Sequence, residues 1–362
     1  MNIGIDISQI VYAGTGVARF TDGLVKAVCK YDKTNQWTFF FSSLRQKLPN
    51  EIKSCINKQG GKIIQYTLPP TLLSIIWNDL HLYDVENIAP NLDWFITSDW
   101  TEPPAKKTKK ATIVHDLVYL RYPETVDSKI LKVQQKRLQL VKKESNLIIS
   151  DSICTKNDLI ELLKIPENKI KVIYPGVEIN SSTIDKEQII SKFGLHQPYI
   201  LTVGKSEPRK NIKRLISAFQ QINHPEIDLV IVGPKGWDDL NIKGEQIHCL
   251  GFVNDQELAT LYQNCLFFTL PSIWEGFGYP VIEAMQAGAP VTCSNTSSIK
   301  EIAGNAALTF NPLQISDIKS ALQMMIDDQP LRTRLISMGK KQQQLFNWEN
   351  YYNELITTLK KN

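Results

Sequence analysis

Residues 266–293 read LFFTLPSIWEGFGYPVIEAMQAGAPVTC. A short apolar run leads into a glycine-containing loop, a helical pattern follows, and a second apolar run ends the stretch. Pro280 suits the first position of a helix, and Gly288 suits its C-terminal stop. The stretch therefore predicts a strand–loop–helix–strand unit, which is the repeating element of a parallel sheet.

The same alternation extends in both directions along the chain. Further strands are predicted at 2–7, 37–41, 62–66, 94–97, 111–114, 147–150, 171–173, 199–203, 228–232 and 247–250, with strands at 266–270 and 291–293 in the opening stretch. A helix is predicted over 128–145. The two series of strands are separated by a polar connector between 177 and 198. We therefore expect an α/β protein of two doubly wound, Rossmann-like domains that face each other across a cleft.

The predicted domains are residues 1–178 and 179–346. A final helix within 347–362 has one apolar face and could pack back on the first domain or on the second.

Composition excludes several classes of protein. The chain has 362 residues, 43% hydrophobic and 22% charged, with a net charge of +4, which gives no indication of a nucleic-acid partner. No apolar run is long enough to span a membrane, and MNIGIDISQI at the N-terminus is not a secretory signal. The six cysteines form no C-x-x-C pair, which predicts scattered buried thiols in a reducing cytoplasm and no structural zinc.

Polar residues of the second half follow predicted strands, where parallel sheets bind ligands. Arg209 and Lys210 lie in EPRKN after the strand 199–203, and could hold a phosphate group or be an ordinary solvated pair. Asn211 is a sensible N-cap for the next helix. Residues 276–279 can direct amides at an anion. Glu275 and Glu283 can accept hydrogen bonds from sugar hydroxyls, although Glu283 could also be a helix-surface residue.

The first half offers weaker candidates. GTGVARF at 14–20 opens a helix, but Arg19 stands where a dinucleotide fingerprint needs its third glycine, so an anion site and an ordinary turn both remain open. Gly204-Lys-Ser206 fails as Walker A and as a nucleophile elbow, since Tyr199 and Pro208 replace the required glycines. His115 ends an apolar strand, where a structural or a catalytic role is open.

Together these motifs resemble the family 4 glycosyltransferases, retaining enzymes of GT-B fold that use nucleotide sugars. The resemblance covers nearly the whole chain and rests on five segments: GTGVARF at 14–20, VHD at 114–116, EPRKN at 207–211, LGFVNDQEL at 250–258 and WEGFGYPVIEAMQAGAPV at 274–291. The last contains the E-x7-E motif of Glu275 and Glu283.

The resemblance implies the following roles. His115, Asp116 and Glu275 would act at the reacting centre, and Glu275 would also bind hydroxyls of the transferred sugar. The remaining donor-binding residues would be Gly16, Arg209, Lys210, Val253, Gly276, Phe277, Gly278, Tyr279, Val281 and Glu283. Arg209 and Lys210 would bind the diphosphate, Glu283 the ribose, and Val253 would lie beside the base.

The pattern most resembles mannosyltransferase members that use GDP-mannose, and UDP-sugars remain open as donors. The acceptor would be a glycan or a lipid-linked oligosaccharide. No metal or other cofactor is expected, because cations and a helix N-terminus can stabilise the leaving diphosphate. A nucleotide-sugar epimerase of the same fold, a non-catalytic nucleotide-sugar binder and a structural protein remain alternatives.

The first domain also carries an excess of positive charge. Residues 101–145 contain eleven basic and five acidic residues, a net +6, which predicts peripheral contact with an anionic membrane or an ordinary solvated face. The basic residues are Lys106, Lys107, Lys109, Lys110, Arg121, Lys129, Lys132, Lys136, Arg137, Lys142 and Lys143.

Overall fold

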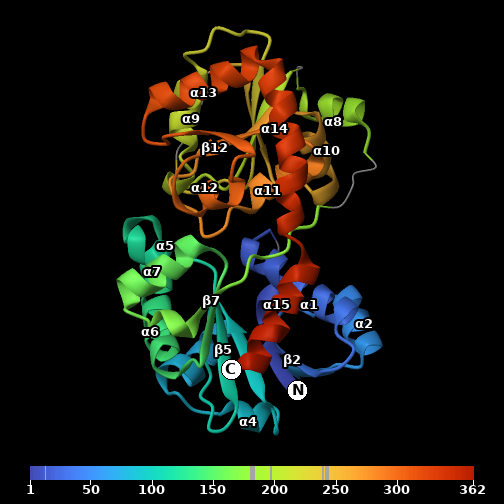
Figure 1. Cartoon of the computed structure of the whole chain (residues 1–362), viewed down its shortest axis with the longest axis vertical. Coiled ribbons are helices and arrows are strands. Elements are labelled where there is room, and N and C mark those ends of the chain that lie inside the picture. Colours follow the sequence, from blue (N-terminus) through green and yellow to red (C-terminus); the bar gives the residue numbers. More distant parts are fainter. Residues whose placement is uncertain (13, 180–183, 196–197, 239, 241–243) are drawn as a thin grey trace. The chain divides into compact units, whose positions relative to one another are not determined.

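The computed structural model describes residues 1–12, 14–179, 184–195, 198–238, 240 and 244–362. They form two compact units, one of Met1–Gly176 with Asn347–Asn362 and one of Val177–Phe346 (Figure 1). The boundary therefore lies two residues before the predicted one. The polar connector predicted between 177 and 198 falls partly outside the described residues, at 180–183 and 196–197.

The first unit is built on a seven-stranded parallel sheet in the order β3-β2-β1-β4-β5-β6-β7. Its strands are β1 (Asn2–Asp6), β2 (Gln36–Ser42), β3 (Lys62–Tyr66), β4 (Trp94–Ser98), β5 (Lys109–Val114), β6 (Leu147–Ser150) and β7 (Ile170–Val172). Its helices and helical turns are η1 (Ser8–Val11), α1 (Gly16–Tyr31), α2 (Asn50–Gln59), α3 (Pro70–Ser74), η2 (Ile75–Asp79), α4 (Val85–Ile88), α5 (Val118–Arg121), η3 (Pro123–Thr125), α6 (Ser128–Glu144), α7 (Ile153–Leu163), η4 (Glu167–Lys169) and α15 (Trp348–Lys361).

The second unit is built on a six-stranded parallel sheet in the order β10-β9-β8-β11-β12-β13. Its strands are β8 (Tyr199–Val203), β9 (Asp228–Val232), β10 (Ile247–Gly251), β11 (Phe267–Leu270), β12 (Val291–Ser294) and β13 (Ala307–Phe310). Its helices and helical turns are α8 (Lys186–Phe193), η5 (Pro208–Lys210), α9 (Ile212–Phe219), α10 (Asp255–Asn264), α11 (Tyr279–Ala287), α12 (Ser297–Ala303), α13 (Ile315–Asp327), α14 (Gln329–Gln342) and η6 (Gln343–Leu345).

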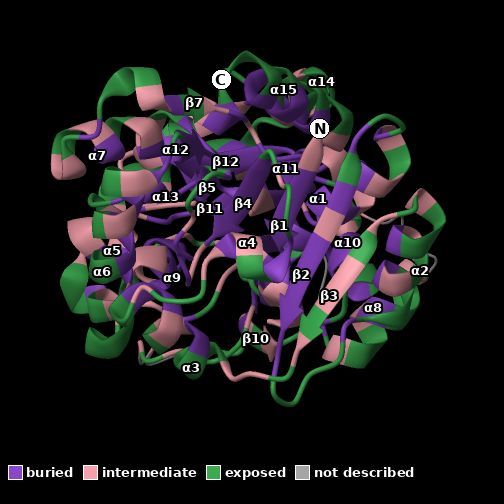
Figure 2. Ribbon diagram, turned by 90° about the horizontal axis from the view of Figure 1, so that it is seen from below, coloured by how far each residue is buried: buried purple, intermediate pink, exposed green. Residues whose placement is uncertain are grey.

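The central strands are buried because each is a nearly continuous apolar run that helices cover. Figure 2 shows β1 and β4 as buried, whereas the edge strand β3 is mostly partly exposed. The two-domain, doubly wound fold class is confirmed, and each predicted strand is present with its ends within two residues. The sequence analysis missed β13, in which only Phe310 is buried, so its pattern is weak.

The C-terminal helix α15 belongs to the first unit and lies beside α1 (Figure 1). Trp348 fills a space that two glycines leave open: a Cβ at Gly23 or Gly176 would lie 2.1 or 2.4 Å from its ring. The ring of Phe20 on α1 packs edge-on against Trp348 and Tyr351, with centroids 5.7 and 5.4 Å away. Of the two placements left open, packing on the first domain is therefore the one observed.

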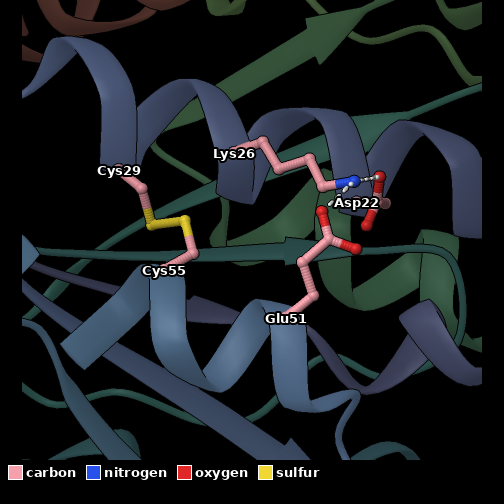
Figure 3. The surroundings of a disulfide bond; sticks show 5 residues. All are labelled: Asp22, Lys26, Cys29, Glu51 and Cys55. Carbon is pink, nitrogen blue, oxygen red and sulfur yellow. Dashed lines mark ion pairs between the residues drawn. A yellow bond between two sulfur atoms is a disulfide. The ribbon is translucent and has the colours of Figure 1, made fainter. Parts of the chain in front are cut away.

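The expectation of six scattered buried thiols is wrong. Cys29 on α1 and Cys55 on α2 form a disulfide, because the two helices pack side by side and bring the Cα atoms within 5.9 Å (Figure 3). One turn earlier on each helix, Lys26 bridges Asp22 and Glu51 at 3.0 and 3.1 Å (Figure 3). The other four cysteines form no disulfide within the described residues; Cys265 and Cys293 are buried as expected, but Cys249 is exposed and Cys154 is half-buried.

In the part of the chain that the structure describes, no helix is long and apolar enough to cross a membrane.

Candidate functional site

The candidate site of the second unit lies where the strand order reverses. β8 and β11 are neighbours in the sheet although two strands separate them in sequence, so the loops that follow them meet at the point where such sheets bind ligands. Arg209 and Lys210 come from the loop after β8, and Glu275 from the loop after β11. The Ile273 amide donates to the Arg209 carbonyl at 2.7 Å and fastens one loop to the other.

Glu275 accepts hydrogen bonds from both cations. Arg209 Nη1 lies 3.0 Å from Oε2, and Lys210 Nζ lies 2.5 Å from Oε1. Ser272 Oγ also donates to Oε1 at 2.6 Å. The two predicted phosphate ligands, both partly exposed, thus form one cluster with the buried first glutamate of the E-x7-E motif.

Charges within the cluster shift the pKa values of its members. Burial by itself would raise the pKa of Glu275, but Lys210 and Arg209 outweigh it and lower that pKa to about 2. Burial lowers the pKa of Lys210 and Arg209 adds to this, while Glu275 acts against both. Arg209 Nε also lies 3.3 Å from Glu207 Oε2, and Lys205 Nζ lies 3.2 Å from Glu207 Oε1. Three cations therefore share two carboxylates and keep an excess of positive charge, which suits a diphosphate.

Two serines of α12 hold the loop that follows Glu275. Ser298 Oγ donates to the carbonyls of Glu275 and Phe277 at 2.8 and 2.9 Å, and Ser297 Oγ accepts from the Glu275 amide at 3.1 Å. Sequence reasoning missed this pair. Two adjacent serines at the start of a short helix give no local signal that their hydroxyls support a loop more than twenty residues earlier.

The loop then enters α11 through glycine. Gly278 has φ of 107° and precedes α11, Tyr279 begins the helix, and Pro280 is therefore its second residue. Phe277 is buried against the rings of Tyr279 and Phe346, with centroids 5.0 and 5.6 Å away. The first turn of a nine-residue helix, including Val281, thus follows directly on the cluster, as predicted from sequence.

Glu283 is not a surface residue, so that interpretation is wrong. It is 5% exposed, and Tyr262 Oη of α10 donates to its Oε2 at 3.1 Å. Val253 is also buried and precedes Asn254, the N-cap of α10. Gly276 is buried between Glu275 and Phe277.

The expected capping bond of Asn211 is also absent. Asn211 has φ of 58° and precedes α9, and no capping hydrogen bond from its side chain is found in the described structure. Instead Nδ2 donates to the carbonyls of Pro271 and Pro312 at 3.0 and 2.7 Å. The buried side chain therefore joins the loops after β8, β11 and β13.

The first unit places His115, Asp116 and Gly16 at the carboxyl edge of its own sheet. His115 Nδ1 lies 2.6 Å from Asp151 Oδ2, and the ring of Phe20, one turn after Gly16, packs edge-on against the imidazole. Asp116 Oδ1 accepts from the Val118 amide at 3.0 Å and so shapes the turn into α5. Gly16 is exposed and begins α1.

Among the described residues, no three His, Cys, Asp or Glu side chains are grouped as metal ligands. The predicted independence from metal therefore stays a prediction. The catalytic and binding roles of all these residues are likewise predictions.

Residues 184–342, which contain the whole of the cluster, match the model of the family described as glycosyl transferases group 1. The second unit is thus similar to the group 1 glycosyltransferases over the residues of the cluster. It is 27% identical to an Escherichia coli protein named O-antigen chain mannosyltransferase B, over 99% of this chain and 100% of that protein. It is 31% identical to O-antigen chain mannosyltransferase RfbU of Salmonella typhimurium, over 58% of this chain and 59% of the relative.

Solved structures confirm the GT-B fold. A sucrose-phosphate synthase from Thermosynechococcus elongatus superimposes with a TM-score of 0.75 and 18% identity, over 100% of this chain and 98% of that one.

Proposed function

We propose that this glycosyltransferase moves a mannosyl residue from GDP-mannose to a glycan or lipid-linked oligosaccharide, with retention of anomeric configuration. The observation that supports this most is the cluster of Arg209, Lys210 and Glu275 beside the first turn of α11. The names of the two relatives favour mannose as the sugar.

The proposed chemistry follows from where charge develops. Breaking the bond between sugar and diphosphate leaves negative charge on the phosphate oxygens, which Arg209, Lys210 and the α11 N-terminus can stabilise. As the diphosphate binds, its oxygens take over the cations, and Glu275 becomes available to hydroxyls of the transferred sugar. Glu283, fixed by Tyr262, would accept from the ribose hydroxyls.

The test is a panel of GDP- and UDP-sugars, each incubated with and without a lipid-linked acceptor, with release of nucleoside diphosphate as the readout. We expect acceptor-dependent release from GDP-mannose and an α-linked product from the α-linked donor. A new sugar or nucleotide sugar formed without acceptor would instead indicate an epimerase, and binding without turnover would indicate a non-catalytic protein.

Peripheral membrane contact is the second part of the proposal, and the structure reduces the basic surface that would make it. Lys110 and Arg137 are 2% exposed and face the buried Glu102 at 3.6 and 3.9 Å, so neither belongs to a solvated face. The exposed lysines of α6 are Lys129, Lys132, Lys136, Lys142 and Lys143.

Apolar side chains accompany those lysines. η2 packs against α6, and Lys136 pairs with Asp79 at its end. Ile75, Leu80 and Leu82, in and just after η2, are 46–59% exposed. Lysines beside exposed apolar groups suit the interface of an anionic bilayer.

The test is co-sedimentation with anionic and neutral liposomes. We expect salt-sensitive binding to anionic liposomes that weakens when Lys129, Lys132, Lys142 and Lys143 are changed to Gln. A matched control changes four exposed lysines of the second unit, Lys235, Lys300, Lys340 and Lys341. Equal binding by both variants would contradict the assignment of this surface.

A further inference from the structure

His115 and Asp151 are brought together by the register of the first sheet. β5 and β6 are adjacent and parallel, and their last paired residues are Val114 and Ser150. The residues that follow, His115 after β5 and Asp151 after β6, therefore also lie next to each other. Their side chains meet at the carboxyl edge, where His115 Nδ1 lies 2.6 Å from Asp151 Oδ2. Sequence reasoning named His115 but not Asp151, because the two are 36 positions apart.

Both the backbone and the ring of His115 are held by neighbouring residues. Thr155 Oγ1 of α7 donates to the His115 carbonyl at 3.2 Å, and the Phe20 ring lies edge-on with its centroid 4.7 Å away. His115 Nε2 is buried, and it has no hydrogen-bond partner among the residues that the structure describes. A ring nitrogen that has lost water without gaining a partner is costly, unless a ligand supplies one.

Asp151 differs from a carboxylate that serves only the fold. Asp32, in the same unit, accepts from the amides of Thr34 and Asn35 and from the side chains of Asn35 and Trp37. These four bonds lower its pKa to about 2 even though burial opposes them. Asp151 is equally buried, but His115 provides its one hydrogen bond within the described structure, and Oδ1 has no partner there.

Charges around the ring favour its protonated form. Burial by itself would lower the pKa of His115, but Asp151, then Asp99 and Asp116, outweigh it and raise that pKa. Burial raises the pKa values of Asp151 and Asp99, and the charge of His115 acts against burial at both, helped at Asp99 by Arg137. The charge of Asp151 adds to burial in raising the pKa of the Tyr351 phenol. Of these three carboxyl groups, Asp151 is the one that has a hydrogen bond to the ring in the described structure.

We infer that Asp151 is a positioning residue for the transfer reaction: it fixes Nδ1 of His115 as a protonated nitrogen and retains the imidazolium, whose Nε2–H then donates to an oxygen of the nucleotide sugar. This inference rests on the proposed function for its substrate. A neutral imidazole held in the same way has an unprotonated Nε2, which can only accept. Asp151 thus decides the form in which His115 meets the donor.

The first arm of the test is nitrogen-15 NMR of the imidazoles in the full chain, with His115 assigned through His115→Gln. We expect Asp151→Asn to lower the pH at which His115 titrates by about one unit or more, since an amide keeps the geometry but not the charge. Asp151→Glu keeps the charge, and its His115 should titrate above that of Asp151→Asn. The control is Asp158→Asn on α7, which removes a buried carboxylate paired with Arg121.

The second arm is the pH profile of donor turnover. We expect Asp151→Asn to lower kcat at pH 8 about tenfold while KM for the donor changes much less, and to move the alkaline limb of kcat to lower pH by about one unit. An unchanged His115 titration in Asp151→Asn, or an equal shift in Asp158→Asn, would overturn the inference. Absence of turnover in the wild type would refute the proposed function alone, because the NMR arm needs no substrate.

Discussion

Replacing Glu275 by Gln tests the cation–carboxylate cluster of the second unit. The substitution keeps the shape of the side chain and removes the negative charge that Arg209 and Lys210 share. Lys210 then loses its anion and Arg209 keeps only Glu207, which destabilises the fold until a diphosphate supplies the missing negative charge. Stability should therefore fall, while affinity for a free nucleoside diphosphate should be unchanged or higher.

The magnitude follows from the pKa of Glu275. Its value of about 2, against an ordinary 4.5, is a difference of about 2.5 units, or about 3 kcal/mol at ~1.36 kcal/mol per unit. Glu275 is 8% exposed, so solvent screens little of this. Burial of the Lys210 ammonium opposes the gain, and we therefore expect a loss of about 2–3 kcal/mol at pH 7, equivalent to roughly 5–10 °C in Tm for a domain of this size.

The pH dependence has a defined sign. A carboxylate with a depressed folded pKa stabilises the protein above its unfolded pKa, and the contribution fades as pH falls from about 4.5 toward 2. Urea unfolding of wild type and Glu275→Gln at pH 7, 5, 4 and 3 should show a difference that shrinks by about half between pH 5 and pH 3. Glu226→Gln removes an exposed partner of His224 in the same unit and should change little. A difference that is absent at pH 7, or independent of pH, would refute the reasoning.

Two other substitutions and one chelation experiment test the donor site. Glu283→Gln should weaken binding of free GDP by about tenfold in a calorimetric titration, since a charge-assisted hydrogen bond to a ribose hydroxyl contributes about 1.5 kcal/mol. If the variant binds GDP with wild-type affinity, Glu283 does not bind the ribose. Arg209→Ala combined with Lys210→Ala should lower turnover efficiency at least about tenfold for each cation removed. Circular dichroism checks that the variant is folded, and full activity would show that neither residue binds the donor. Turnover in EDTA should equal turnover in magnesium, and activity that only a divalent cation restores would contradict the metal-free chemistry.

The fold could be predicted from sequence because its strands are local apolar runs between clear helix signals. Gly288 ends α11 with φ of 85°, as its position after the helical pattern predicts. β13 was missed because its ALTF segment is short and mostly part-exposed. The Cys29–Cys55 bridge was missed because helix packing, and not spacing along the chain, brings the two residues together.

Much of the candidate site was also accessible from sequence, because its residues follow strands in recognisable motifs. Arg209, Lys210 and Glu275 were each named, but the direct contacts of both cations with Glu275 were not. Ser298, Tyr262 and Asp151 were missed because each acts across the fold on a residue from another segment. Sheet order and register create those pairings, and a single sequence does not display them.

The decisive measurement is acceptor-dependent release of GDP from GDP-mannose, made side by side for the wild type and for the Arg209→Ala, Lys210→Ala double variant. We expect release by the wild type only when acceptor is present, with the mannosyl residue found on the acceptor, and a loss of at least about a hundredfold in the double variant. Those results would support the proposed function. Mannosyl transfer that proceeds equally well without both cations, or no transfer from any nucleotide sugar, would contradict it.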